Sequence, residues 1–525
     1  MVEFFKNRWV LFLILVVFIL CKIPHLHYPY YWDESWPYAV AIRDMYLHGA
    51  SLLPTAVDPE LSRGHPLFFH VIAAAWMHVF GNSHTSMHSF ALTISLLFLV
   101  AIYEAGLRLF DKRVAVMSVA LVVTQVVFYV QSSYVLFEML VAFLSFLSLF
   151  FYVRRKYFLT ALALSALFYT KESGLIMGFV LGMAAFVGLF DKKVELKTRL
   201  YQILSIATPC VLICIFFIIQ KSIRGWYIFP LYNNLIEHRW DSFWYNFRRN
   251  TIRNTFYEHQ KFYYFILLLF ISVIAAIKNK NVKYACFFLP AIFIYCSVND
   301  GRSERVGNSI FLFAFFIFSL VAMLYLLKRL KIYKNAYEEQ FITLSCVFIF
   351  CFFCFSSMNF FTYRYLLPSF VLLFFFTGVM TVKLIESSYP LLFYPVLLLM
   401  LVISFFAFKN DYGYGDVDIH DVDGMDVQQG VVDYMEKMNY YDKNIACGSF
   451  LELQHLLDPA TGFLSSDRNF KKIKWSIDGY TEIVIFDNLE PDYRYKNEFN
   501  KDSSYSLVFK TQKGGIWAEV YLKTH

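Results

Sequence analysis

Apolar segments of membrane-spanning length, separated by short charged breaks, dominate most of the chain up to about residue 408. A hydrocarbon core about 30 Å thick needs roughly 20 apolar residues per helix. Charged residues make up only 17% of the chain, against roughly a quarter in soluble proteins. We therefore predict a mainly α-helical, polytopic membrane protein with about thirteen transmembrane helices. The predicted spans are 9–24, 87–109, 114–131, 136–153, 157–170, 174–190, 200–220, 262–277, 283–298, 308–327, 341–357, 365–384 and 389–408.

Two long loops are predicted on one side of the membrane. Residues 25–86 form the first, and residues 221–261, rich in Trp, Tyr, Arg and Asn, form the second. Within the first loop, the apolar run from Pro66 to Phe80 is short and carries two histidines. We predict an interfacial or re-entrant helix there.

Basic residues predict the orientation of these spans. Short loops rich in Lys and Arg mark the cytoplasmic side of a membrane protein. With thirteen spans, the basic loops all fall on one side, together with the N-terminus, and residues after about 410 fall outside. The net charge of +7 thus reflects topology rather than nucleic-acid binding. The basic groups are Lys6 and Arg8, Lys112 and Arg113, residues 154–156, Lys192 to Arg199, residues 278–283, and Lys328 to Lys334.

The composition divides the chain into a transmembrane domain, 1–410, and a soluble domain, 411–525, which the predicted topology places outside the cytoplasm. The latter begins with an acidic run, 411–426, whose Asp spacing does not match an EF-hand loop and which we interpret as a solvated linker. A helix is predicted at 427–438, and period-two or continuous apolar runs predict strands. These strands are 443–448, 481–486, 505–510 and 516–522. The prediction is a small α/β domain, independent of the chemistry.

An acidic pair, Asp33-Glu34, lies just outside the first predicted span. A carboxylate at a partly desolvated interface is suited to act as a general base on a hydroxyl. The alternative is that the two carboxylates cap the helix that follows them. The residues alone leave both interpretations open.

Further polar groups are predicted on the same side. Glu138 lies at the outer end of the fourth span, where an acidic residue is costly unless it faces a polar cavity or a cation. Lys171 and Arg364 lie at the outer ends of other spans, where simple interfacial snorkelling is the alternative to a role in binding. Arg63 and His65 open the short interfacial helix.

Five short strings, taken in order, resemble the GT-C superfamily of glycosyltransferases that use polyprenyl-phosphate sugars. The similarity is greatest to protein mannosyltransferases and the aminoarabinose transferase of lipid A (glycosyltransferase families 39 and 83), across most of residues 1–410. Two positions depart from the pattern, with His65 where many members have Lys and His88 where Arg is common. The strings are Asp33-Glu34, His65-Pro66, Glu138-Met139, Thr170-Lys171 and Arg364-Tyr365-Leu366-Leu367-Pro368.

The resemblance implies a hexosyl or pentosyl transferase with a polyprenyl-phosphate-linked donor and a protein, lipid or glycan acceptor. Asp33 would deprotonate the acceptor hydroxyl, which attacks with inversion. Glu34 or Glu138 would position the acceptor or hold a divalent metal ion; no other cofactor is expected. The cations would stabilise the phosphate leaving group. The implied binding residues are Lys171, Arg364 and Tyr365, with Arg63 and His65 behind them.

The resemblance also implies a bacterial inner (plasma) membrane protein with its site outside the cytoplasm. Loop 221–261, with Arg248, Arg249 and Arg253, would cover the site or contact lipid phosphate, unless it is simply solvated. The main alternative is a flippase or other transporter of lipid-linked sugar, which needs charges through the bilayer depth. An O-antigen ligase or polymerase and an inactive scaffold are the others.

Overall fold

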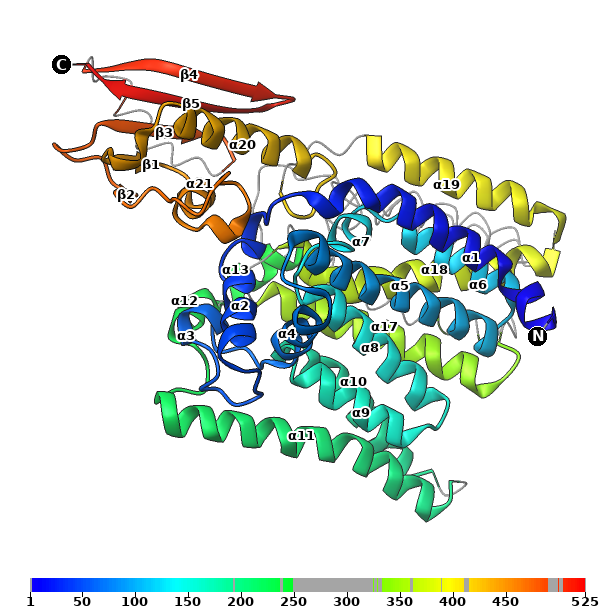
Figure 1. Ribbon diagram of the computed structural model, residues 1–525. Coiled ribbons are helices and arrows are strands. Elements are labelled where there is room, and N and C mark those ends of the chain that lie inside the picture. The colour runs from blue at the N-terminus through cyan, green and yellow to red at the C-terminus, as the bar shows by residue number, and fades with distance from the viewer. Residues whose placement is uncertain are drawn as a thin grey trace.

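The computed structural model describes residues 2–191, 194–236, 239–248, 324, 328, 333–358, 362–388, 390–409, 415–489, 499 and 504–524. Over these residues the chain forms a helical bundle with a separate sheet-containing domain at its C-terminal end (Figure 1). The predicted spans 262–277, 283–298 and 308–327 lie outside the described residues, apart from Leu324. The count of thirteen therefore stays a prediction.

Long apolar helices build the bundle. Six segments of the described residues are long and apolar enough to cross a membrane: 8–27, 84–109, 172–189, 196–224, 336–357 and 363–383. Each predicted span in the described part coincides with one or more helices. These are α1 (Val2–Lys22), α5 (His84–Leu109), α6 (Lys112–Val123), α7 (Val126–Gln131), α8 (Glu138–Val153), α9 (Tyr157–Phe168), α10 (Leu175–Leu189), α11 (Leu196–Arg224), α17 (Ala336–Ser357), α18 (Leu367–Ser388) and α19 (Phe393–Lys409).

The predicted span 114–131 is broken, because two polar side chains bind the backbone in place of the helical ladder. Thr124 Oγ1 donates to the carbonyl oxygen of Ala120 over 2.9 Å. Gln125 Oε1 then accepts from the backbone N–H of Phe128 over 2.6 Å and caps α7. The chain thereby turns at the end of the bundle where the polar groups gather.

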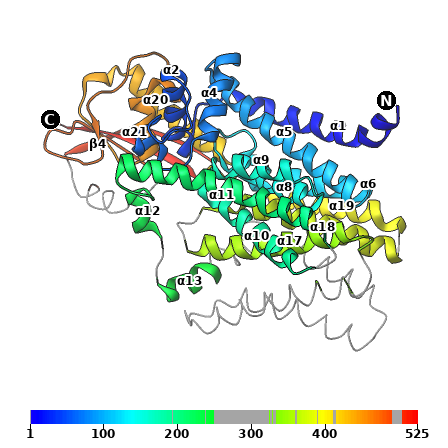
Figure 2. The same ribbon diagram turned by 90° about the horizontal axis from the view of Figure 1, so that it is seen from below.

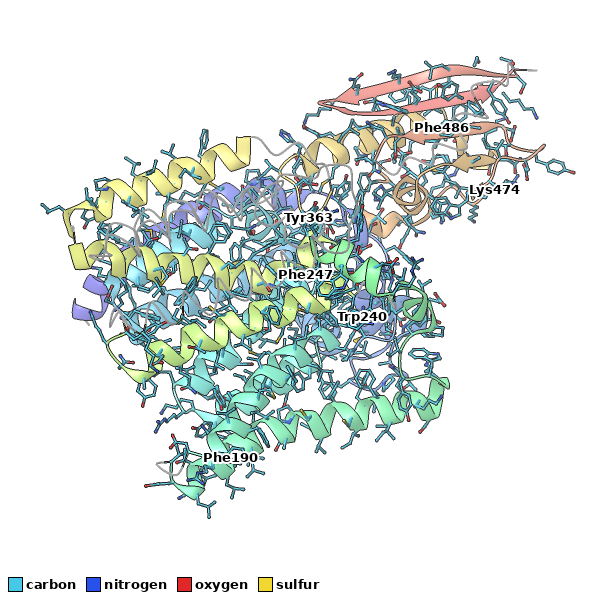
Figure 3. The ribbon with its side chains drawn as sticks, turned by 180° about the vertical axis from the view of Figure 1, so that it is seen from behind. Phe190, Trp240, Phe247, Tyr363, Lys474 and Phe486 are labelled. Carbon is cyan, nitrogen blue, oxygen red and sulfur yellow. The ribbon has the colours of Figure 1, made fainter. Side chains whose placement is uncertain are left out.

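The bundle has two chemically different ends. At one end lie the N-terminus and part of the predicted basic loops, where Arg154 and Arg155 approach the Tyr337 ring at 5.8 Å. Lys383, near the end of α18, joins this end, since its Nζ lies 3.4 Å from Glu338 Oε2 in the first turn of α17. The C-terminal domain lies beyond the other end (Figures 1 and 2). In Figure 3, Tyr363 lies near that domain and Phe190 lies far from it.

The first predicted loop folds into short elements around the second end. They are η1 (Ile23–His27), η2 (Trp32–Glu34), α2 (Tyr38–His48), α3 (Pro59–Ser62) and α4 (Phe68–Phe80). The predicted helix at 66–80 is confirmed as α4, which buries Phe69, Ala73 and Met77 against α2 and α5. The described part of the second loop adds α12 (Pro230–Leu235) and α13 (Trp240–Asn246).

The C-terminal domain contains a five-stranded sheet in the order β2-β1-β3-β5-β4. The parallel strands are β2 (Ile473–Lys474), β1 (Ile445–Cys447) and β3 (Ile483–Asp487). Antiparallel to β3 lies β5 (Ile516–Lys523), with Ile483 opposite Leu522, and β4 (Tyr505–Lys513) lies at the edge. Helix α20 (Asp421–Lys437) packs against β4 and β5, and α21 (Phe450–Leu457) follows β1.

The four predicted strands are confirmed, whereas β2 and α21 were not predicted. The interpretation of the acidic run as a solvated linker is wrong for the residues after 414, because it packs against the bundle. Asp416 and Asp421 are buried, and the Tyr134 hydroxyl donates to Asp421 Oδ2 over 2.8 Å. Helix α20 accordingly begins at Asp421, six residues before the predicted start at Val427.

Candidate active site

Arg364 is the centre of the predicted polar cluster. It lies on η5 (Tyr363–Leu366), directly before α18, and only 2% of its side chain is exposed. One terminal nitrogen, Nη2, contacts Asp33 Oδ2, and the other, Nη1, contacts Asp416 Oδ2. The planar guanidinium group is suited to several carboxylate contacts at once. The structure therefore brings together the first long loop (25–86), η5 and the start of the C-terminal region.

Glu138 and Lys171 complete the cluster. Glu138 is the first residue of α8, and Lys171 precedes η3 (Glu172–Gly174). Lys171 Nζ donates to Glu138 Oε1 over 3.1 Å, and the same oxygen lies 3.7 Å from Arg364 Nε. Among the described residues, Glu138 Oε2 has no hydrogen-bond partner although it is buried. A buried carboxylate oxygen without a donor retains the capacity to accept a hydrogen bond from a bound molecule.

Aromatic rings surround the Lys171 ammonium group. Its nitrogen lies 4.1 Å from the centre of the Tyr365 ring and 4.3 Å from that of Phe137. Such contacts stabilise a cation that has left water. The side chains of Lys171 and Arg364 are thus both buried and do not extend into solvent at the membrane surface.

Glu34 lies on the same short helix as Asp33 but makes different contacts. Its Oε1 accepts from the backbone N–H of Val135 over 2.7 Å and lies 3.0 Å from His88 Nε2. Its Oε2 accepts from the backbone N–H of Tyr31 over 3.3 Å. Only 1% of Glu34 is exposed, whereas Asp33 keeps a quarter of its side chain exposed. Asp33 therefore stays partly open to solvent beside Arg364, whereas Glu34 is enclosed by protein donors.

Arg63 and His65 lie further from the centre. His65 Nδ1 lies 2.8 Å from Glu172 Oε2, and its Nε2 lies 3.0 Å from the Tyr232 hydroxyl. Arg63 has a left-handed backbone, with φ of 49°, and its guanidinium group lies 5.4 Å from the Trp36 ring. Burial raises the pKa of the Tyr232 hydroxyl, which therefore stays protonated at neutral pH. The second loop thus contacts the first through Tyr232; Arg249 and Arg253 lie outside the described residues.

Most donors and acceptors in the cluster satisfy one another through side chains and backbone groups, whereas Glu138 Oε2 and Arg364 Nε have no hydrogen-bond partner among the described residues. Among the described residues, no group of three or more His, Cys, Asp and Glu side chains is arranged to hold a metal ion. Of the two carboxylates considered for a metal, Glu34 is committed to donors from three directions, so it does not fit a ligand position. Glu138 retains one oxygen without a donor.

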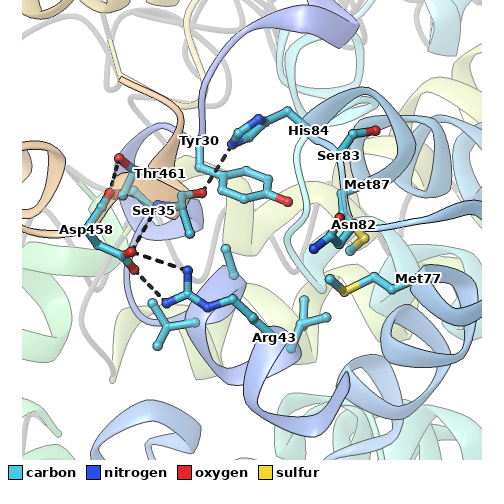
Figure 4. A pocket seen from close by; sticks show the side chains of 14 residues that line it. Tyr30, Ser35, Arg43, Met77, Asn82, Ser83, His84, Met87, Asp458 and Thr461 are labelled. Atoms are coloured by element: carbon cyan, nitrogen blue, oxygen red, sulfur yellow. Dashed lines mark hydrogen bonds and ion pairs between the residues drawn. The ribbon is translucent and has the colours of Figure 1, made fainter. Parts of the chain in front are cut away.

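A cavity of about 180 Å³ lies nearby, between α2, the start of α5 and the C-terminal domain. Arg43 and Asp458 form an ion pair at its wall, with 2.8 Å between Nη2 and Oδ2 (Figure 4). The His84 ring lies opposite, and its Nε2 is 3.2 Å from the carbonyl oxygen of Ala460. Asp33, Glu138, Lys171 and Arg364 do not line this cavity, so it is separate from the polar cluster.

No family model and no curated protein sequence matches the chain. Among solved structures, ArnT from Cupriavidus metallidurans, in its apo state and bound to undecaprenyl phosphate, is similar at 13% identity, with 98% of both chains covered and a TM-score of 0.49. The oligosaccharyltransferase AglB from Archaeoglobus fulgidus is similar at 11% identity, over 98% of this chain and 74% of its own, with a TM-score of 0.46. These neighbours are GT-C proteins.

A third GT-C structure, the protein O-mannosyltransferase complex Pmt1-Pmt2 of S. cerevisiae, is similar over 41% of this chain and 34% of its own. Its identity is 15% and its TM-score 0.33. The GT-C superfamily is also the one that the five sequence strings resemble.

Sequence reasoning missed Asp416 as a residue of the polar cluster. It lies in an acidic run whose spacing does not distinguish one aspartate from another.

Proposed function

We propose that this chain is a membrane glycosyltransferase that moves a sugar from a polyprenyl-phosphate donor to the hydroxyl group of an acceptor. The observation that carries the proposal is the contact between a partly exposed carboxylate, Asp33, and a buried cation, Arg364, with Lys171 and Glu138 beside them. A base and an anion-binding pair are the two components that such a transfer needs.

In the proposed reaction, Asp33 removes the proton of the acceptor hydroxyl. The hydroxyl oxygen attacks the anomeric carbon from the face opposite the phosphate, so the configuration inverts. The bond between that carbon and the phosphate oxygen breaks, and the electron pair leaves with polyprenyl phosphate. Arg364 and Lys171 stabilise the charge that develops there, because fixed cations in a buried site interact strongly with an oxyanion.

The other polar groups have supporting parts in this proposal. Glu138 Oε2, which lacks a donor among the described residues, accepts a hydrogen bond from the acceptor. Tyr365 covers the Lys171 ammonium group, and His65 fixes the second loop through Tyr232. Arg63 adds positive charge behind them. A metal ion held partly by Glu138 would add further positive charge.

The proposed location is a bacterial inner membrane, with the site and the C-terminal domain outside the cytoplasm. Arg154 and Arg155 follow the end of α8, whose first residue is Glu138, and Lys383 lies near the end of α18, which begins directly after η5, the short helix that carries Arg364. These basic groups therefore lie at the opposite end of the bundle from Arg364. By the positive-inside rule this basic end faces the cytoplasm. A lipid-linked donor suits such a site, since its lipid is already in the membrane.

The test is sugar transfer by purified protein in vesicles that contain a polyprenyl-phosphate sugar. Asp33→Asn is expected to abolish transfer while the protein inserts and folds normally. Asp44→Asn is the matched control, because Asp44 lies in the same loop but pairs only with the surface residue His48 in the described structure. Near-normal transfer by Asp33→Asn would show that Asp33 is not the base.

The same vesicles separate the transferase from the transporter. A transferase releases polyprenyl phosphate in proportion to the sugar transferred, whereas a flippase moves intact lipid-linked sugar without releasing it. Mass spectrometry of glycans and lipid-linked sugars in a deletion strain then identifies the substrates. An accumulated donor names the sugar, and a lost modification names the acceptor.

A further inference from the structure

We propose that Asp416 is a positioning residue of the transfer site. It holds Arg364 in place during the reaction, while the contact of Arg364 with Asp33 weakens and its contact with the donor phosphate strengthens. This inference rests on the proposed function. It assigns a role in the site to the C-terminal region, which begins after the last membrane helix. Asp416 contacts Arg364 Nη1, and Asp33 contacts Nη2.

Asp416 is held by contacts with the bundle at its own backbone and five residues further along the chain. Its own carbonyl oxygen accepts from Gln131 Nε2 over 2.5 Å, at the end of α7. Five residues later, Asp421 Oδ2 accepts from the hydroxyl of Tyr134, which lies just beyond α7. Both Asp416 and Asp421 are buried. The segment that carries Asp416 is therefore fixed to the same turn that leads into α8 and Glu138.

The two terminal nitrogens of Arg364 have different partners, and this matters for the reaction. When Asp33 takes up the acceptor proton, its attraction for Arg364 weakens, because the carboxyl group becomes neutral. A buried guanidinium group without a fixed partner would then shift. Asp416 keeps its charge on Nη1, so Nη2 and Nε stay directed at the leaving phosphate. A displacement of about 1 Å in such a group can cost on the order of a hundredfold in rate.

Charge in the cluster gives this inference a distinctive signature. Three carboxylates (Asp33, Glu138 and Asp416) face two cations (Arg364 and Lys171). Nearby, Arg63 and Glu172 add one charge of each sign, so one negative charge remains in excess. An anionic donor is repelled by that excess. Neutralising Asp416 therefore favours donor binding but loosens Arg364. A residue that served only folding would not strengthen donor binding when it is changed.

The test is steady-state transfer by Asp416→Asn in the full-length protein. We expect kcat to fall between about tenfold and a hundredfold while the KM for the donor falls. Polyprenyl phosphate without sugar, used as a competitive inhibitor, should bind more tightly to this variant. Asp416→Glu keeps the charge and should recover part of the rate. Asp426→Asn removes a charge from an exposed aspartate that contacts Lys513, and should leave both constants unchanged.

A second measurement does not depend on activity. The melting temperatures of Asp416→Asn, Arg364→Gln and the double variant form a cycle, and the double variant should lose clearly less than the sum of the single losses. Additive losses, or kcat and KM for Asp416→Asn within twofold of the unmodified protein, would overturn the inference. If the melting temperatures are strongly non-additive but the unmodified protein transfers no sugar, the proposed function is overturned. The contact between Asp416 and Arg364 would still hold in that case.

Discussion

The backbone N–H of Val135 donates a 2.7 Å hydrogen bond to Glu34 Oε1 and ties the acidic pair to the turn before α8. Because Glu34 also accepts from the backbone of Tyr31, it fixes the position of its neighbour Asp33 relative to Glu138. The two adjacent carboxylates thus have different duties. Glu34 organises the loop, and Asp33, which contacts Arg364 and stays partly exposed, is the proposed base.

Glu34→Gln should therefore damage the fold more than the chemistry. The amide group presents a donor where the carboxylate had an acceptor, and at least one buried N–H loses its partner, at a cost of about 1 to 3 kcal/mol. We expect a lower melting temperature and a lower yield, with transfer activity retained in the protein that folds. Asp33→Asn should show the reverse pattern. Normal stability of Glu34→Gln with complete loss of transfer would contradict this division.

Lys171→Gln should affect both stability and donor binding. Lys171 and Glu138 are a buried pair with 3.1 Å between the charged atoms, and removing one partner of such a pair costs about 3 kcal/mol or more. The donor KM should rise, because a cation near the phosphate is lost. Lys197→Gln is the control, since that lysine is exposed on α11.

Adding Glu138→Gln to Lys171→Gln separates the two effects. The second change removes the uncompensated charge, so we expect the melting temperature to recover while transfer stays low. Thermal unfolding and donor titration of the two variants measure this. A double variant that melts no higher than Lys171→Gln would show that the pair is not a stabilising unit.

Hydrophobic runs predicted the helices well because a bilayer leaves the backbone few alternatives. The break at Thr124 and Gln125 was not predicted, because it depends on two side chains bonding to the backbone within an apolar run. The resemblance to GT-C proteins singled out Asp33, Glu138, Lys171 and Arg364 as a group, and the structure brings them into one cluster.

Contacts between distant parts of the chain could not be predicted from the sequence. The acidic run after residue 414 has the composition of a solvated linker, and only its packing against α7 distinguishes Asp416 from its neighbours. The pairing of Arg43 with Asp458 likewise joins segments more than 400 positions apart and follows no local pattern. For this reason the C-terminal domain was predicted to stand apart from a site that it helps to build.

Gly424→Ala tests how closely the C-terminal domain packs against the loop that carries the acidic pair Asp33-Glu34. A methyl group at Gly424, in the second turn of α20, would overlap the hydroxyl of the fully buried Tyr31. Overpacking of this kind costs typically about 1 to 3 kcal/mol. We expect faster hydrogen exchange at the start of α20 and reduced transfer, because Tyr31 adjoins the acidic pair through Trp32.

Gly479→Ala is the matched control for that change, since an added methyl group there meets no atom within 4 Å. It should leave exchange and transfer as they are. If Gly424→Ala behaves like Gly479→Ala, the contact between α20 and Tyr31 is not tight in solution.

Two buried titratable groups on α21 predict an unusual pH dependence for the C-terminal domain. Burial, together with the charge of Asp487, raises the pKa of Glu452 well above its ordinary value of 4.5. Burial lowers the pKa of His455 from 6.5 to about 3. The folded domain therefore holds a neutral carboxyl and a neutral imidazole across much of the pH range.

The stability of this domain should be greatest between about pH 4.5 and pH 6.5. Above pH 4.5 the unfolded Glu452 ionises and the folded one does not, so stability falls as pH rises. Below pH 6.5 the unfolded His455 takes up a proton and the folded one does not, so stability falls as pH drops. Each slope is about 1.4 kcal/mol per pH unit, and the two cancel between these values. Glu452→Gln should remove the alkaline decline, and His455→Phe the acidic one. Hydrogen exchange of α21 in the full-length protein, corrected for intrinsic rates, measures both, and an alkaline decline that persists in Glu452→Gln would assign it to another group.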